Sequence, residues 1–282
     1  MGRLIKIIVT LLWLFPMATI ANATPSDNAA QISVVQDLMR IGQYQQAYEM
    51  AIALETAGGY ALASESLARQ VLLGEAQNLK KAAKTARDLA EEALRLKPNH
   101  QNARLQYALA DGFVVRMSSG LTAWVKKLPQ KSFEKIEIYR QFFPEDERGD
   151  ALLGAWHLGI ARKIGDERAN NLFGASIREG MRLYEQALQK SPNDPVMLIN
   201  YAFSLLTLQA DDYYDLNKVR GLIEHAQAQP PQDDLQRKLI EHGLNVLTLL
   251  ATPEKARNYA DQFLDGEEIE SDIYEYSERA NN

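Results

Sequence analysis

The sequence contains no cysteine in 282 residues, and it has only four histidines. The missing thiols exclude disulfides, thiolate metal sites, a cysteine nucleophile and a lipid attached to an N-terminal cysteine. No metal-binding HExxH or HxH spacing joins the histidines, which are His100, His157, His225 and His242. A Gly-x-Ser-x-Gly elbow, a phosphate loop and a dinucleotide fingerprint are missing as well. We therefore expect that the protein is not an enzyme and binds no metal or cofactor. A catalytic site made of carboxylates that only folding brings together would not be visible in such a search.

Long hydrophobic runs are also scarce. Apolar residues make up 46% of the chain, too many for a fully disordered protein, yet only one run approaches the length of a membrane-spanning helix. The charge balance is 31 Lys and Arg against 37 Asp and Glu, a formal net charge of −6. Because nucleic-acid affinity comes from basic residues that neutralise phosphates, this balance argues against a nucleic-acid partner. A soluble, helix-rich globular protein is the class that remains.

The first 23 residues have the pattern of a secretory signal peptide. Arg3 and Lys6 make a basic start, residues 7–20 form an apolar stretch, and Ala21-Asn22-Ala23 has the small-x-small pattern of a cleavage site. An uncleaved membrane anchor is the alternative, but 14 apolar residues interrupted by a proline are short for a bilayer core of about 30 Å. Cleavage after Ala23 predicts a periplasmic protein that is not a lipoprotein and has no stable membrane insertion.

The rest of the chain divides into a flexible leader at 24–31, a helical domain at 32–265 and an acidic tail at 266–282. The tail holds six acidic side chains and one arginine, a composition typical of disordered segments. Plain solubility is one explanation for this tail. Its Ile273, Tyr274 and Tyr276 leave open a short docking motif that orders on binding.

Residues 32–265 carry apolar residues three and four apart, and no alternating strand pattern persists, so the domain is predicted to be all-α. A 34-residue unit spans 67–100. Its small residues Gly74, Ala86 and Ala93 stand where two antiparallel helices would approach closely, and Pro98 stands where the second helix would end. This unit resembles a tetratricopeptide repeat. The resemblance implies an α-solenoid, a superhelix of five to six stacked helix pairs.

The proline-containing end of the unit recurs at Pro144, at Pro192 and at Pro230-Pro231. Residues 233–250 and 253–264 predict a closing helix pair. Two connections, within 111–131 and 163–176, are longer than a 34-residue repeat requires. They are either surface insertions that a degenerate repeat tolerates or loops that edge the inner surface and shape what binds there.

The tetratricopeptide resemblance also implies a candidate partner-binding groove. In that family the first helix of each pair lines the concave side, and its places two, five, nine and twelve usually face the groove. Together with a Trp-His pair, the residues carried over are Leu105, Leu109, Arg148, Ala155, Trp156, His157, Leu158, Ile199, Phe203 and Leu206. The helix expected at 195–208 is apolar nearly all round, which is typical of a covered core helix. The alternative is an open apolar groove for a partner helix or a small amphipathic ligand.

The stretch 151–158, Ala-Leu-Leu-Gly-Ala-Trp-His-Leu, is the most distinctive outside the 34-residue unit. It resembles a segment of exported proteobacterial tetratricopeptide proteins of unassigned function, and the likeness covers roughly residues 140–250. Trp156 and His157 are explained either by packing and hydrogen bonding or by a functional role. The resemblance implies a non-enzymatic scaffold or adaptor of the cell envelope that binds another envelope protein or peptide through its concave surface.

More distantly, the layout resembles the T component of tripartite ATP-independent periplasmic transporters. That resemblance implies an alternative function, in which the groove holds a small organic acid or hydrophobic solute beside a transporter's solute-binding subunit. Self-assembly through the end pairs also stays open, because terminal repeats must be capped or covered.

Overall fold

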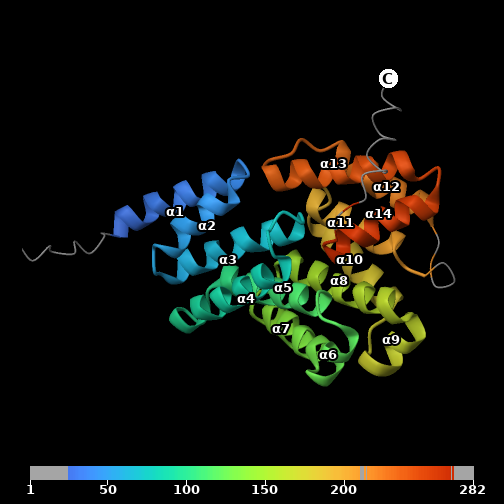
Figure 1. The fold of residues 1–282 in the computed structure, drawn as a ribbon, viewed down its shortest axis with the longest axis horizontal. Helices are drawn as coiled ribbons and strands as arrows, with labels where there is room; N and C mark the ends of the chain where they lie inside the picture. Colours follow the sequence, from blue (N-terminus) through green and yellow to red (C-terminus); the bar gives the residue numbers. More distant parts are fainter. Residues whose placement is uncertain (1–24, 210–212, 214, 268, 270–282) are drawn as a thin grey trace, which may run out of the picture.

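The computed structural model describes residues 25–209, 213, 215–267 and 269, so the expected signal peptide and nearly all of the acidic tail lie outside it. Within these residues the regular elements are all helices, which confirms the all-α prediction (Figure 1). In chain order they are α1 (Pro25–Arg40), α2 (Tyr44–Ile52), α3 (Ala57–Leu72), α4 (Leu79–Leu96), α5 (Gln101–Arg116), α6 (Gly120–Val125), α7 (Leu128–Phe142), α8 (Glu147–Ile164), α9 (Asp166–Phe173), α10 (Ile177–Lys190), α11 (Pro195–Leu206), α12 (Leu216–Gln227), α13 (Asp234–Leu249) and α14 (Pro253–Asp265). None of the described helices is long and apolar enough to span a membrane.

Most of these helices form packed pairs that repeat along the described chain. The pairs are α1 with α2, α3 with α4, α5 with α7, α8 with α10, α11 with α12 and α13 with α14. The first helices of successive pairs also contact one another, so the pairs stack side by side. The short helices α6 and α9 fill the two connections that the sequence predicted to be long. The architecture is therefore repeat-like, with two helical insertions.

The ends of the second helices follow the recurring prolines. Helices α4, α7, α10 and α12 each end two or three residues before a proline, at Pro98, Pro144, Pro192 and Pro230. A proline lacks the N–H that continues a helix, so these positions act as stops. The next first helix then begins with its own cap; the Asp194 side chain, for example, accepts a hydrogen bond of 2.8 Å from the Val196 N–H at the start of α11.

Two local predictions were wrong. Gly74 was expected inside a first helix at a close helix contact, but α3 ends at Leu72 and Gly74 lies in the following turn with a φ of +72°. The Glu75 N–H donates to the Gln70 carbonyl across this turn, so Gly74 ends the helix in the left-handed conformation that glycine adopts most easily. The second difference concerns the leader, because α1 begins at Pro25 and residues 25–31 are helical. A proline is favourable at the first helical position, and the alanines that follow favour a helix.

Glycine does permit close packing elsewhere, between α8 and α10. A Cβ atom on Gly154 would lie 2.9 Å from the Tyr184 ring and 3.0 Å from the Gly180 carbonyl. A Cβ atom on Gly180 would lie 2.8 Å from the Leu158 side chain. The two helices therefore meet at a distance that a larger residue at either position cannot keep without a shift.

The stack of pairs closes on itself, because α1 contacts α13. The Arg69 guanidinium at the end of α3 lies 2.7 Å from the carboxylate of Asp233, the cap of α13. The Tyr44 hydroxyl on α2 donates a hydrogen bond of 3.2 Å to Asp234. Gly42, in the turn before α2, lies so close to Asp234 that it leaves no room for a Cβ atom. The first and last pairs are thus joined by contacts between residues that are far apart in the sequence.

The last helix, α14, covers the first helices of two other pairs. It packs on α11, where the rings of Phe203 and Phe263 meet edge to face with centroids 5.3 Å apart. It is also tied to α8 by ion pairs, with Arg162 at 2.6 Å from Asp261 and Lys163 at 2.7 Å from Asp265. This placement decides how much of the expected groove is open.

Candidate functional site

The ten predicted groove residues differ widely in exposure. Those that are buried are Leu105, Trp156, His157, Leu158, Ile199, Phe203 and Leu206. Leu109 and Ala155 are half-buried, and Arg148 is exposed. Ile199 and Phe203 have no accessible surface, because α11 is covered by its neighbours and by α14. Of the two interpretations of α11, the structure agrees with a core helix that its neighbours cover. In this conformation a partner reaches only Arg148 and parts of Leu109 and Ala155.

The Trp-His pair contacts the residues that directly follow the two insertions. The Trp156 indole N–H donates a hydrogen bond of 3.0 Å to the Pro129 carbonyl, and its ring lies 5.1 Å from that of Phe133 on α7. The His157 Nδ1 accepts a hydrogen bond of 3.1 Å from the Ser176 N–H after α9. Burial lowers the pKa of His157, which favours the neutral ring that this contact needs. Packing and hydrogen bonding account for both side chains.

Arg148, the exposed residue of the set, belongs to a junction of three helices. Its guanidinium lies 2.8 Å from Asp146, the cap of α8. Asp146 also accepts hydrogen bonds from Tyr139 of α7, at 2.5 Å, and from Gln101 of α5, at 2.7 Å. Burial alone would raise the pKa of Asp146, but the hydrogen bonds from Arg148 and Tyr139 hold it far below its usual range. A fixed carboxylate thus holds the starts of α5 and α8 against α7.

One turn from these contacts lies an exposed aromatic ring under an arginine. Phe142, at the end of α7, is 48% exposed, and the Arg104 guanidinium of α5 lies 3.8 Å from the ring centroid. Ile138, a further turn back on α7, is 42% exposed. We call Arg104, Ile138, Phe142 and Arg148 the junction surface. Exposed aromatic and arginine side chains of this kind are enriched in the parts of interfaces that carry most of the binding energy.

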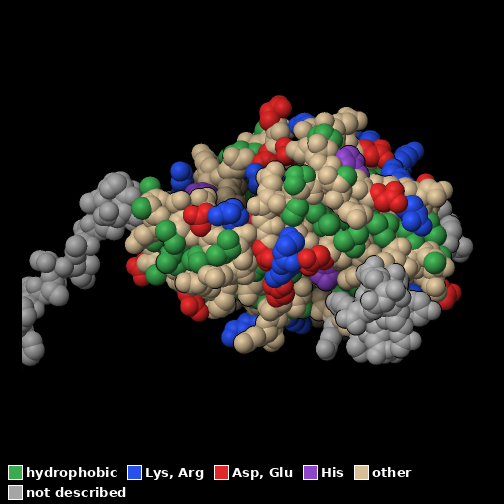
Figure 2. Space-filling view, turned by 90° about the horizontal axis from the view of Figure 1, so that it is seen from above, with side chains coloured by type: hydrophobic (Ala, Val, Ile, Leu, Met, Phe, Trp, Pro, Cys, Tyr) green, Lys and Arg blue, Asp and Glu red, His purple; other side chains and the backbone are tan. Residues whose placement is uncertain are grey.

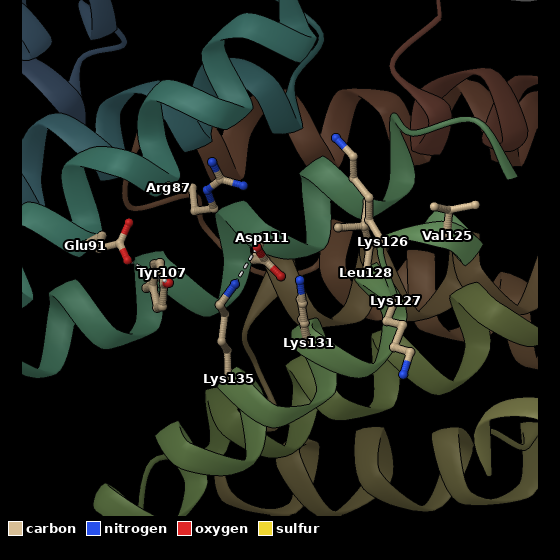
Figure 3. A pocket seen from close by; sticks show the side chains of 10 residues that line it. All are labelled: Arg87, Glu91, Tyr107, Asp111, Val125, Lys126, Lys127, Leu128, Lys131 and Lys135. Carbon is tan, nitrogen blue, oxygen red and sulfur yellow. Dashed lines mark hydrogen bonds and ion pairs between the residues drawn. The ribbon is translucent and has the colours of Figure 1, made fainter. Parts of the chain in front are cut away.

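A second feature, a hollow of about 570 Å³, lies between α4, α5 and the segment from α6 to α7 (Figure 3). Positively charged side chains dominate its lining, namely those of Arg87, Lys126, Lys127, Lys131 and Lys135. Two carboxylates, Glu91 and Asp111, also line it. By contrast, acidic and basic side chains are interspersed on the face seen in Figure 2. We call this site the lysine hollow.

Some groups in the lysine hollow already have partners. The Lys135 ammonium lies 2.6 Å from Asp111 and 4.6 Å from the centroid of the Tyr107 ring. The Tyr107 hydroxyl donates a hydrogen bond of 3.3 Å to Glu91, and burial raises the pKa of Tyr107 to about 12. Arg87 pairs with Asp88 at 2.7 Å. Such fixed groups form one wall of the hollow and hold Lys135 in place.

Sequence reasoning missed both the junction surface, apart from Arg148, and the lysine hollow. Lys127, Lys131 and Lys135 are four residues apart, a spacing that places side chains on one face of a helix and so signals a basic stripe. Their partners on α4 and α5 come from other pairs, and the sequence carries no sign of this meeting. Among the described residues, no group of three His, Asp or Glu side chains is placed to hold a metal ion.

No family model matches the chain, and no curated protein matches it. The class that the fold defines is an all-α protein built of repeat-like helix pairs.

Proposed function

We propose that this protein is a non-enzymatic scaffold or adaptor of the bacterial cell envelope, with tetratricopeptide-like helix pairs that bind another protein or peptide. The recurring pairs and the prolines that end them support the tetratricopeptide likeness. The signal-peptide pattern of residues 1–23 supports an envelope location. Stacked helix pairs of this kind present extended surfaces, and such surfaces suit recognition of other chains.

The observation that carries this proposal is the exposed ring of Phe142 beneath Arg104, on the helix whose Tyr139 also binds Asp146. Here the partner binds at the junction surface, because most of the apolar residues predicted to line a groove are buried, those of α11 beneath α14. The junction is pre-organised by the hydrogen bonds to Asp146, so little side-chain freedom is lost on binding. The Arg104 guanidinium over an exposed apolar ring, with the exposed Arg148 on the neighbouring helix α8, suits a partner segment that combines acidic and apolar side chains.

The test compares Phe142→Glu with Leu172→Glu in residues 24–282. Leu172 on α9 is 51% exposed and lies beyond the opposite end of α8, so it is a matched control for a new charge on an exposed apolar residue. Each variant is crosslinked in the host's envelope, checked for folding by circular dichroism, and then tested against the purified captured protein. We expect wild type and Leu172→Glu to bind one envelope protein and Phe142→Glu to lose it. Equal binding by all three contradicts the proposal, and capture of a solute-binding subunit favours the transporter-associated alternative.

A further inference from the structure

The lysine hollow has a charge that its own side chains do not balance. Five Lys and Arg side chains and two carboxylates line it, a formal excess of three positive charges in a chain whose net charge is −6. Lys126, Lys127 and Lys131 are exposed and form no ion pair with any residue that the structure describes. In Figure 3 the Lys131 ammonium lies near Asp111 and Lys135, whereas the ammonium groups of Lys126 and Lys127 point in different directions at the edge of the hollow. Lysine side chains are long and flexible, so an anion bound in the hollow can draw these positive charges toward it.

A buried carboxylate oxygen of Asp111 is a second, independent feature of the lysine hollow. Asp111 is 4% exposed, and its Oδ1 accepts from Lys135 at 2.6 Å. Its Oδ2 is buried and has no hydrogen-bond partner among the described residues. In Figure 3 this second oxygen points to the side of the hollow on which Lys131 lies. Buried carboxylate oxygens without donors are rare, so the position suits a donor group supplied by a ligand.

The size of the hollow fits a small molecule. Its volume of about 570 Å³ falls within the range of roughly 300–1,000 Å³ typical of small-molecule sites. The Tyr107 ring and the Lys135 stem provide a partly apolar wall, fixed by the cation–ring contact of 4.6 Å.

We propose that the lysine hollow binds a small organic polyanion that carries at least two negative charges and a hydroxyl group. Lys126, Lys127 and Lys131 neutralise the anionic groups, and the ligand hydroxyl donates a hydrogen bond to Asp111 Oδ2. Carboxylates and phosphates share this chemistry, and the phosphate can belong to a soluble ester or to a lipid headgroup. This site is separate from the junction surface and does not depend on partner binding there.

The first test uses citrate and tricarballylate, two tricarboxylates that differ by one hydroxyl group. Isothermal titration of the protein at low salt should give saturable binding of both, tighter for citrate, and no saturable binding of the monoanion acetate. Added salt should weaken the binding, because exposed charges are screened. The triple variant Lys126→Gln/Lys127→Gln/Lys131→Gln should weaken citrate binding by about tenfold or more. Lys97→Gln removes an exposed lysine outside the hollow and should bind citrate as wild type does.

The second test addresses the hydroxyl. Asp111→Asn should remove the preference for citrate over tricarballylate, whereas the triple lysine variant should weaken both ligands equally. Because Asp111 is buried, circular dichroism must first show that the variant folds; the lysine variants, on the surface, test the proposal independently. Equal affinity of wild type and the triple variant for citrate overturns the proposal, as does the lack of any saturable binding.

A third experiment distinguishes a soluble phosphate ester from a lipid headgroup as the ligand. Glycerol 3-phosphate and vesicles of cardiolipin, whose headgroup carries two phosphates and one hydroxyl group, are titrated with wild type and with the triple lysine variant. Vesicle binding that glycerol 3-phosphate displaces assigns the hollow to a lipid headgroup, and binding of glycerol 3-phosphate without vesicle binding assigns it to a soluble ester. If citrate, glycerol 3-phosphate and the vesicles all fail to bind, the hollow is not a polyanion site.

Discussion

The Arg69 guanidinium at the end of α3 lies 2.7 Å from the Asp233 carboxylate at the start of α13, although 164 positions separate the two residues in the chain. Both side chains are only 19% exposed. Arg69 also binds Glu65 at 2.9 Å, so its charge is shared between two carboxylates. An ion pair of this kind, shielded from water, joins the first pairs of the stack to the last pair.

Loss of this ion pair should loosen both ends of the stack together. Arg69→Met leaves Asp233 without its guanidinium, and we expect the free energy of unfolding to fall by about 1–3 kcal/mol. Amide hydrogen exchange should rise in α2, α3 and α13 alike. The matched control is Arg95→Met, which removes an exposed pair with Glu92 and should leave urea denaturation unchanged. A similar loss in both variants would mean that the contact with Asp233 does not couple the ends.

The residues of α11 should behave as core. Phe203 has no accessible surface and meets Phe263 of α14, so Phe203→Ala should lower the free energy of unfolding by about 3–5 kcal/mol. Phe142→Ala, on the junction surface, should change it by about 0.5 kcal/mol or less. Urea denaturation of both variants measures the difference. A small effect at Phe203 would show that α14 does not pack there in solution.

Alanine substitutions at two glycines of α8 should change the stability of the protein in opposite directions. Gly154→Ala places a methyl group 2.9 Å from the Tyr184 ring and 3.0 Å from a backbone carbonyl, and should destabilise the protein by about 1–3 kcal/mol. Gly159 has open space around the same position, so Gly159→Ala should stabilise it by up to about 1 kcal/mol through better helix propensity. Thermal unfolding of the pair tests the close approach of α8 and α10, and destabilisation by both would contradict it.

His242 should make the last helix pair sensitive to acid. Burial lowers its pKa to about 4, from an ordinary value of 6.5, while Nδ1 lies 2.7 Å from the Tyr259 hydroxyl and the ring 4.6 Å from that of Phe263. Between these two values the unfolded chain binds a proton that the folded protein does not, so stability falls as the pH falls from about 6.5 to about 4.

The size of this effect is on the order of 3 kcal/mol, and His242→Gln should remove it. Urea denaturation of wild type and variant at several pH values between 7.5 and 4.5 isolates this contribution from that of the carboxylates. Parallel curves for the two proteins would contradict the assignment to His242.

The sequence predicted the all-α class and the ends of several helices, because those ends depend on neighbouring residues, but it did not predict the short helices α6 and α9. Pro144 and Pro192 stop helices without reference to any other part of the chain, and Asp194 caps the next helix two residues on. Gly74 shows where local reasoning was wrong: a glycine suits both a close helix contact and a helix end, and only the observed φ of +72° separates the two.

The candidate sites were far less predictable. Phe203 and Phe142 are both phenylalanines on helices, and what distinguishes them is α14, which covers one and leaves the other exposed. The lysine hollow depends on Asp111 meeting Lys135 across two helices. Every acidic residue in the chain has many lysines that it could pair with, so the sequence pattern does not specify which pair forms.

The closure of the stack is open to one direct measurement, because a carbodiimide links a lysine to a carboxylate only when the two are in contact. Lys238 on α13 contacts Glu75, 163 positions away in the chain, and Lys163 on α8 contacts Asp265 at the end of α14. Peptide mass spectrometry of the crosslinked monomer should find both links within a single chain. If Lys238 is instead linked only to Asp234 on its own helix, and Lys163 to no residue of α14, the stack is open and the residues beneath α14 are free to bind a partner.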